Sequence, residues 1–89
     1  MKADTNVIGM TPVQSKMARA ALGWSLADLA NKAGVGRATV ARFELGETVH
    51  PETVQKLIGA FVAYGVLLLE PGGKSHSGGA GVRLQSGMR

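Results

Sequence analysis

Two arginines, Arg37 and Arg42, stand in the one stretch of this chain whose side chains suggest a chemistry. This stretch, residues 25–46, reads as two short helices broken at Gly34, with small residues where the helices would pack closely. A guanidinium keeps its charge and offers a planar fork of N–H donors, which suits bidentate contact with guanine or phosphate. Two such groups on the outer face of the second helix are typical of a helix-turn-helix that enters the DNA major groove.

Other kinds of chemistry find little support. His50 and His76 are the only histidines, and neither has the spacing of a metal site or an acid–base pair. The glycine-rich residues 72–81 lack the Gly-Lys-Ser/Thr ending and the following helix of a phosphate-binding loop, so we interpret them as a linker. The chain has no cysteine, which excludes disulfides and thiolate ligands. We therefore expect no enzyme activity, no metal and no cofactor.

Length and charge narrow the class further. Eighty-nine residues make one small domain, and an added subunit interface would help to stabilise so small a core. Ten Lys and Arg against six Asp and Glu give a net charge of +4, which favours a polyanionic partner such as DNA. The alternative is that this charge only aids solubility. The apolar runs are too short to span a bilayer, and nothing resembles a signal peptide, so we expect a cytoplasmic protein.

Three segments are expected along the chain. Residues 1–10 show no pattern and are interpreted as a flexible arm, residues 11–65 as a helical domain, and residues 66–89 as a tail. The tail contains an apolar run at residues 66–69, the glycine-rich linker, and an alternating strand pattern at residues 81–85. The predicted fold is mainly α, with four helices and a short C-terminal β-strand or hairpin.

Helix boundaries follow from capping and turn residues. Thr11, Pro12 and Gln14 predict a first helix that runs to about Leu22, with Val13, Met17, Ala20 and Ala21 on its apolar face. Ser25 caps a second helix whose buried stripe is Leu26, Leu29, Ala30 and Ala33, and Gly34 ends it. A third helix is predicted from about Arg37 to Leu45 with Val40 and Phe43 inward, and Pro51 opens a fourth that ends at Tyr64 and Gly65. Trp24 is expected to pack across the first helix junction.

The residues from about Thr11 to Tyr64 resemble the Cro/cI-like (XRE-type) family of transcription regulators. The resemblance rests on three motifs and on Pro51 at the next helix start: Arg19-x-x-Leu22-Gly23-x-Ser25, Leu29-Ala30-x-x-Ala33-Gly34-Val35, and Thr39-Val40-x-x-Phe43-Glu44-x-Gly46. It implies a compact lambda-repressor-like domain that binds double-stranded DNA through its third helix, in a protein encoded by a bacterium or a phage.

The resemblance also implies roles for particular residues. Arg19 and Glu44 would form a partly buried ion pair, although they could instead be two ordinary surface charges. Base contacts would come from Arg37, Ala38, Ala41 and Arg42, with contacts to phosphate alone as the alternative for both arginines. Phosphate contacts would come from helix starts, namely from Ser25 with the backbone N–H of Leu26, from Thr39 and His50, and from the backbone N–H groups of Glu52 and Thr53. The chain departs from the family pattern where Leu26 replaces the usual glutamine, where Gly36 replaces a Ser or Thr cap, and where Glu47 and Glu52 add negative charge.

The tail suggests a second copy of the chain as a partner. Val66, Leu67, Leu68 and Leu69 are too apolar for an exposed edge strand, so they should pair with residues 82–84, with a second subunit, or with both. With Phe61 they form the expected dimer interface, and a two-fold dimer would place two recognition helices about 34 Å apart on a near-palindromic operator. The sequence thus predicts a dimeric transcription regulator that acts as a repressor, with its own promoter as one candidate target. The alternative is an antitoxin or interaction module whose tail binds another protein.

Overall fold

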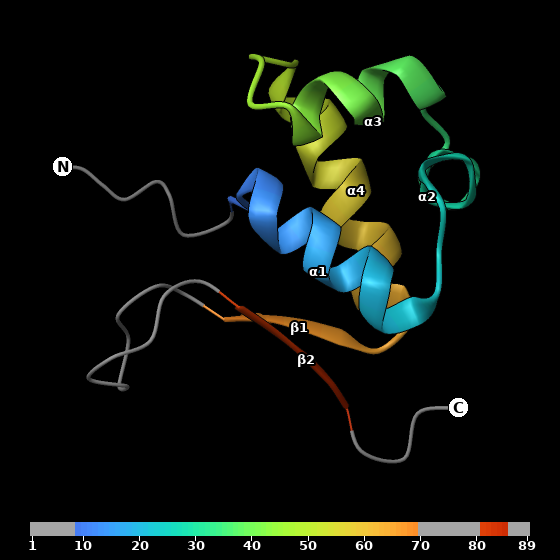
Figure 1. The fold of residues 1–89 in the computed structure, drawn as a ribbon, viewed down its shortest axis with the longest axis vertical. Helices are drawn as coiled ribbons and strands as arrows, with labels where there is room; N and C mark the ends of the chain where they lie inside the picture. Colours follow the sequence, from blue (N-terminus) through green and yellow to red (C-terminus); the bar gives the residue numbers. More distant parts are fainter. Residues whose placement is uncertain (1–8, 70–80, 86–89) are drawn as a thin grey trace, which may run out of the picture.

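The computed structural model describes residues 9–69 and 81–85. Within these ranges the chain forms four helices and two strands: α1 (Pro12–Leu22), α2 (Leu26–Ala33), α3 (Arg37–Glu44), α4 (Pro51–Ala63), β1 (Val66–Leu69) and β2 (Gly81–Leu84) (Figure 1). This order confirms the predicted mainly α fold with a β appendage. The predictions for residues 1–8, 70–80 and 86–89, among them most of the flexible arm and the glycine-rich linker, lie outside the described residues.

Local capping sets the helix starts. The Thr11 hydroxyl accepts a hydrogen bond from the Gln14 N–H (3.1 Å), and the Gln14 side-chain oxygen accepts one from the Thr11 N–H (3.0 Å). Ser25 and Asp28 form the same reciprocal pair at the start of α2. Because each pair satisfies two N–H groups that a helix start leaves without partners, the chain enters α1 and α2 at fixed positions. Gly34, at φ +72°, ends α2 in a left-handed conformation that favours glycine.

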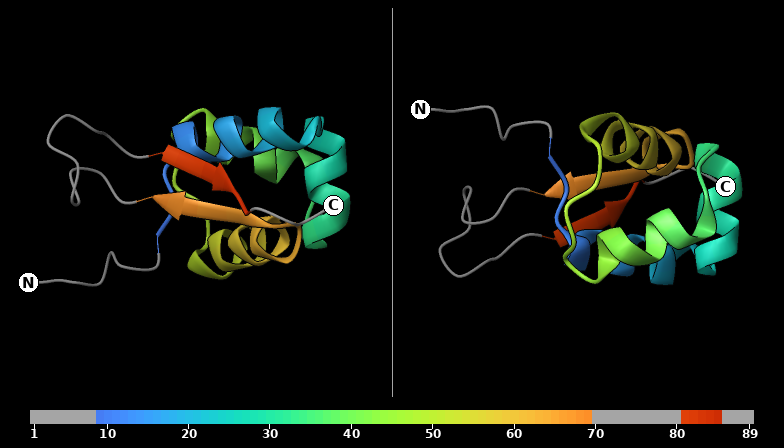
Figure 2. Two further views of the ribbon diagram at one scale, coloured as in Figure 1. Left: turned by 90° about the horizontal axis from the view of Figure 1, so that it is seen from below. Right: turned by 90° about the horizontal axis from the view of Figure 1, so that it is seen from above.

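The helices and the hairpin form layers around α1. In Figure 1, α1 lies between the hairpin and α3, and α4 lies behind it. Figure 2 shows β2 beside α1 and β1 beside α4, which agrees with the packing of these pairs. Trp24, between α1 and α2, stacks on Phe61 of α4 (ring centroids 5.8 Å apart) and meets Tyr64 edge-on, so this side chain joins the α1–α2 junction to α4. The buried apolar side chains are Met10, Ala18, Leu29, Ala30, Val40, Phe43, Leu57, Ala60, Phe61 and Val66.

Two expectations about this core were wrong. Met10, assigned to the arm, is buried among the core side chains. The first helix does not bury the predicted stripe: Val13, Ala20 and Ala21 are exposed, and the buried positions are Gln14, Ser15 and Ala18. The apolar periodicity failed because this helix buries two polar side chains whose hydrogen-bond partners come from distant parts of the chain.

The hairpin is antiparallel, with Val66 opposite Leu84 and Leu69 opposite Gly81. At its Leu69–Gly81 end the hairpin is fastened to α1 by Gln14, whose side-chain amide donates to the carbonyl oxygens of Leu69 (2.8 Å) and Gly81 (3.1 Å). One buried amide therefore holds both strands and also caps α1. The pairing of β1 with β2 within one chain confirms the first of the pairings proposed for the tail.

Replacing Gln14 with glutamate should loosen the hairpin while keeping the α1 cap. Glutamate still accepts from the Thr11 N–H, but it cannot donate to Leu69 and Gly81, and it turns a carboxylate toward two carbonyl oxygens. A buried group left without its hydrogen bond costs about 1–3 kcal/mol. We expect faster amide hydrogen exchange in β1 and β2, with α2 unchanged. Val13→Ala, on the exposed face of the same helix, serves as the control, and unaltered strand exchange in Gln14→Glu would refute this role.

Candidate nucleic-acid interface

The outer face of α3 carries the predicted reading residues. Arg37, Ala38 and Arg42 are exposed and Ala41 is half-buried, while Val40 and Phe43 of the same helix are buried. This division follows from helical periodicity, since positions three and four apart share a face. The structure thus brings the four predicted base-contacting residues onto the outer side of one eight-residue helix.

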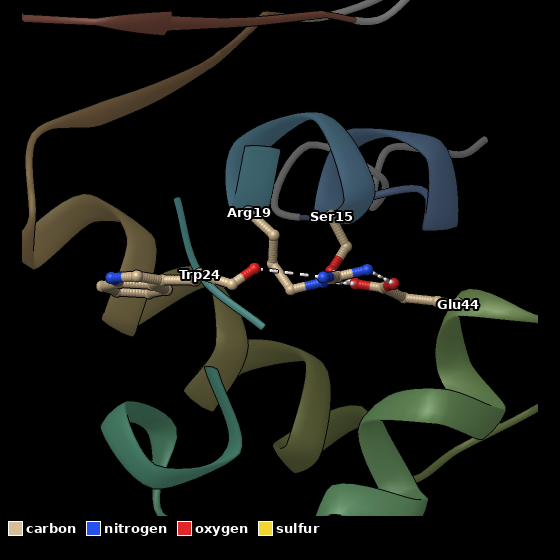
Figure 3. A network of polar contacts seen from close by, with 4 residues as sticks. All are labelled: Ser15, Arg19, Trp24 and Glu44. Carbon is tan, nitrogen blue, oxygen red and sulfur yellow. Dashed lines mark hydrogen bonds and ion pairs between the residues drawn. The ribbon is translucent and has the colours of Figure 1, made fainter. Parts of the chain in front are cut away.

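A buried polar network holds α3 against α1. Glu44, the last residue of α3, accepts hydrogen bonds from Arg19 Nε (3.0 Å) and from a terminal guanidinium nitrogen (2.7 Å), while its side chain is only 5% exposed. The other terminal nitrogen of Arg19 donates to the Trp24 carbonyl oxygen (3.2 Å), as Figure 3 shows. The hydrogen bond to Glu44 raises the pKa of Arg19 above its ordinary value, although partial burial opposes the shift. The implied ion pair is present and fixes the end of α3.

Ser15 belongs to this network and was missed by sequence reasoning. Its hydroxyl donates to Glu44 Oε2, the same oxygen that accepts from Arg19 Nε, and the Ser15 side chain is fully buried (Figure 3). A usable signal was present, because Ser15 stands four residues before Arg19 and the two therefore share one face of α1. Gln14 was identified as a cap, but its contact with the hairpin was not foreseen. No local pattern connects it with strands that lie much later in the chain.

Arg42 has a carboxylate beside it. Its Nε lies 4.0 Å from Oε1 of Glu47, and both side chains are more than half exposed. An ion pair in such a setting contributes little to stability. Its consequence is electrostatic, because Glu47 offsets part of the positive charge of the Arg42 guanidinium. Arg37 has no such neighbour among the ion pairs of the described residues.

The predicted phosphate contacts at α2 and α3 differ in what they offer. Ser25 is exposed, but its N–H donates to Asp28 and its oxygen accepts from the Asp28 N–H, so its hydroxyl hydrogen is what it offers an anion. Leu26 and Thr39 are half-buried. Gly36 caps α3 without a side-chain hydrogen bond, although a Cβ there would meet nothing closer than Thr39 Oγ1 at 3.7 Å. A serine would fit at Gly36, so the missing cap is not imposed by lack of space.

Backbone N–H groups at the start of α4 donate to the residue that caps this helix, His50. His50 Nδ1 accepts from the Glu52 N–H (3.2 Å), and the Thr53 N–H donates to the His50 carbonyl oxygen (2.9 Å). These N–H groups are therefore engaged within the chain, which weakens the expectation that Glu52 and Thr53 contact phosphate through them. Because Nδ1 is the acceptor, the neutral His50 ring carries its proton on Nε2, and this N–H remains a donor for phosphate.

The predicted dimer interface needs correction at two positions. Phe61 is 0% exposed and Val66 is 1% exposed, because both lie in the core of this single chain. Neither is available to a second subunit. Leu68 is half-buried and packs against the core, whereas Leu67 (36%) and Leu69 (38%) are exposed. The strand alternates, so Val66 and Leu68 face the helices while Leu67 and Leu69 face outward.

Membrane-spanning helices and metal sites are two further features that bear on function. No helix in residues 9–69 is long and apolar enough to cross a membrane. In the part of the chain that the structure describes, no group of three or more His, Cys, Asp or Glu side chains is placed to hold a metal ion.

Comparison with known proteins agrees with this geometry. A helix-turn-helix family model matches residues 16–61, which include α2, α3, both members of the Arg19–Glu44 pair and most of α4. The comparison with curated proteins gives no match. The matched region covers more than half of the chain, and the chain belongs to the Cro/cI-like, XRE-type helix-turn-helix family of DNA-binding regulators. Binding of double-stranded DNA follows from this membership.

Proposed function

We propose that this protein is a sequence-specific regulator that represses transcription as a homodimer on a near-palindromic operator. The observation that carries the proposal is the pair of exposed arginines on α3, a helix whose end is held to α1 by Arg19 and Glu44. A fixed reading helix lets a few side chains meet a few base edges in one register. Repression needs no further surface, because protein bound to an operator blocks a promoter that overlaps it. In autoregulation, the blocked promoter is the one that drives this protein's own gene.

Arg37 is the principal reader in this proposal. It is the first residue of α3 and is exposed, so it can reach deepest when the start of the helix enters the major groove. Guanine offers N7 and O6 to one guanidinium, and the methyl group of thymine suits the small apolar Ala38 and Ala41. Arg42 adds a second contact that Glu47 weakens. Each half-site should therefore contain a G·C pair read by Arg37.

Phosphate contacts would be fewer than the family pattern suggests. The Ser25 hydroxyl and the His50 Nε2–H remain as donors, while Leu26 has no polar side chain and Glu52 repels phosphate. Affinity for DNA depends strongly on how many phosphates a protein neutralises. A single copy should accordingly bind weakly, and occupation of an operator should depend on two copies acting together.

The outer face of the hairpin is the proposed dimer surface. Leu67 and Leu69 are exposed there, and Val62 and Tyr64 are exposed on and just after α4, which lies beside β1. Exposed apolar side chains on a short sheet invite pairing with another chain. The hairpin lies on the opposite side of α1 from α3 (Figure 1), so a partner seated on it leaves the reading face uncovered. Half-sites should be separated by one DNA turn, about 34 Å, or a multiple of it.

Mass and footprint measurements on a double variant test this proposal. Leu67→Glu with Leu69→Glu places charges on the dimer surface and should leave helical circular dichroism unchanged, because neither side chain belongs to the core. Light scattering should give a dimer for the parent and a monomer for the variant. The footprint of the parent should cover two half-sites, and the variant should need at least tenfold more protein for protection.

A monomer mass for the parent at all concentrations would refute the dimer. That outcome would favour the alternative role, a module whose tail binds a different protein, because the same exposed leucines would then lack a partner copy. A dimer that protects no defined sequence would refute sequence-specific regulation while keeping the interface.

A further inference from the structure

A small apolar hollow lies beside the reading face of α3. It is lined by residues of α1, α2 and α3 and by the residue that follows α3, namely Lys16, Leu26, Ala41, Glu44 and Leu45. Its volume is about 230 Å³. Its surface is almost entirely apolar although two of these residues are charged. The Glu44 carboxylate is engaged by Arg19 and Ser15, and Lys16 is exposed, which accounts for the lack of polar surface.

The hollow is continuous with the DNA-contacting face. Ala41 belongs both to the hollow and to the outer face of α3, and Leu45 directly follows that helix with its side chain 75% exposed. Its charges also favour DNA, since Lys16 is exposed whereas Glu44 is neutralised by Arg19. Sites for small molecules usually measure about 300–1,000 Å³, so this hollow is too small to be a typical one.

The chemistry of DNA limits what can enter an apolar hollow from the major groove. Phosphates and most base edges are polar, and the exception among base edges is the 5-methyl group of thymine. We propose that Leu26, Ala41 and Leu45 receive a pyrimidine 5-methyl group, which makes Leu26 a specificity-determining residue outside the reading helix. The inference rests on the proposed sequence-specific binding and adds the group that is read. Leu26 stands where the family usually has a glutamine. In this proposal it contacts a methyl group where that glutamine would contact phosphate.

Deoxyuridine substitution tests this inference, because it removes only the methyl group of thymine. The experiment uses the full chain and a duplex recovered by selection for binding, with each thymine replaced in turn. Burial of one methyl group corresponds to about a fourfold change in affinity. We expect about fourfold weaker binding when one particular thymine in each half-site is replaced.

Variants then assign the methyl group to the hollow. In Leu26→Ala the parent and deoxyuridine duplexes should bind with nearly equal affinity, whereas Val13→Ala, an exposed apolar truncation on α1, should keep the fourfold difference. The ratio is measured within one variant, so a loss of folded protein affects both duplexes alike.

Three outcomes would overturn the inference. Sequence-specific binding without any thymine methyl effect, or an effect at that particular thymine that persists undiminished in Leu26→Ala, refutes the methyl contact and leaves the proposed function standing. Absence of any sequence preference refutes both.

Discussion

Replacing Glu44 with alanine should lower the melting temperature by roughly 12–24 °C. The substitution leaves the Arg19 guanidinium, 20% exposed in the native fold, without the carboxylate that accepts two of its hydrogen bonds. It also removes the acceptor of the fully buried Ser15 hydroxyl. Breaking a buried pair costs about 3–5 kcal/mol, and the partial exposure of Arg19 argues for about 3. For a domain of this length that loss corresponds to the stated temperature shift.

Glu47→Ala is the matched control for this prediction. It also removes a glutamate that faces an arginine, but both partners are more than half exposed, so stability should change by less than about 0.5 kcal/mol. DNA binding should respond in opposite directions: Glu44→Ala weakens it because α3 loses its fastening, and Glu47→Ala strengthens it because Arg42 gains net charge. Equal melting temperatures for Glu44→Ala and the parent would show that the pair does not hold α3.

Replacing Arg37 with alanine should cost the operator complex about 1–3 kcal/mol, or roughly 5- to 150-fold in affinity. Arg37 is exposed at the start of α3, so its removal should leave thermal stability nearly unchanged. Loss of a bidentate contact to guanine should relax the preference at one base pair of each half-site while the other positions stay discriminated. Affinities for single-base variants of the operator, measured at one fixed salt concentration, show this pattern directly.

Lys56→Ala provides the charge-matched comparison. Lys56 is exposed on α4 and has no proposed base contact, so its loss should leave the ranking of operator variants intact. If Arg37→Ala weakened binding to every sequence by the same factor, Arg37 would be a phosphate contact, and base reading would have to be assigned elsewhere on α3.

The helix boundaries could be predicted because they depend on neighbouring residues. Thr11 with Gln14, and Ser25 with Asp28, cap their helices within one turn of chain, and Gly34 ends α2 by its own backbone preference. The third and fourth helices follow the predicted boundaries to within one residue, ending at Glu44 and Ala63. The exposed positions of Arg37 and Arg42 follow from the same local periodicity.

The buried face of α1 could not be predicted in this way. Apolar periodicity selected Val13, which is exposed, and passed over Gln14 and Ser15, which are buried. Those polar side chains are buried because Leu69, Gly81 and Glu44 satisfy them, and all three partners are far away in the sequence. A period computed from hydrophobicity contains no information about such partners.

In the tail, too, the apolar character of a residue did not show whether it lies in the core or at the surface. The apolar character of residues 66–69 predicted a partner for the strand, and with Phe61 it led to the assignment of Phe61 and Val66 to a subunit interface. The structure places both in the core because the hairpin folds back on α1 and α4 of the same chain. Within β1, strand alternation separates Val66 from Leu67 and Leu69 once the inward face of the strand is known.

The central claim, that α3 reads a defined DNA sequence, is tested most directly by selection from a random duplex library. The protein is mixed with the library at a fixed salt concentration, and the bound fraction is amplified and sequenced, with Arg37→Ala run in parallel. We expect two inverted half-sites, separated by one DNA turn or a multiple of it, with a G·C preference that Arg37→Ala loses at one position. Enrichment of no sequence over the starting library would show that α3 reads no defined sequence.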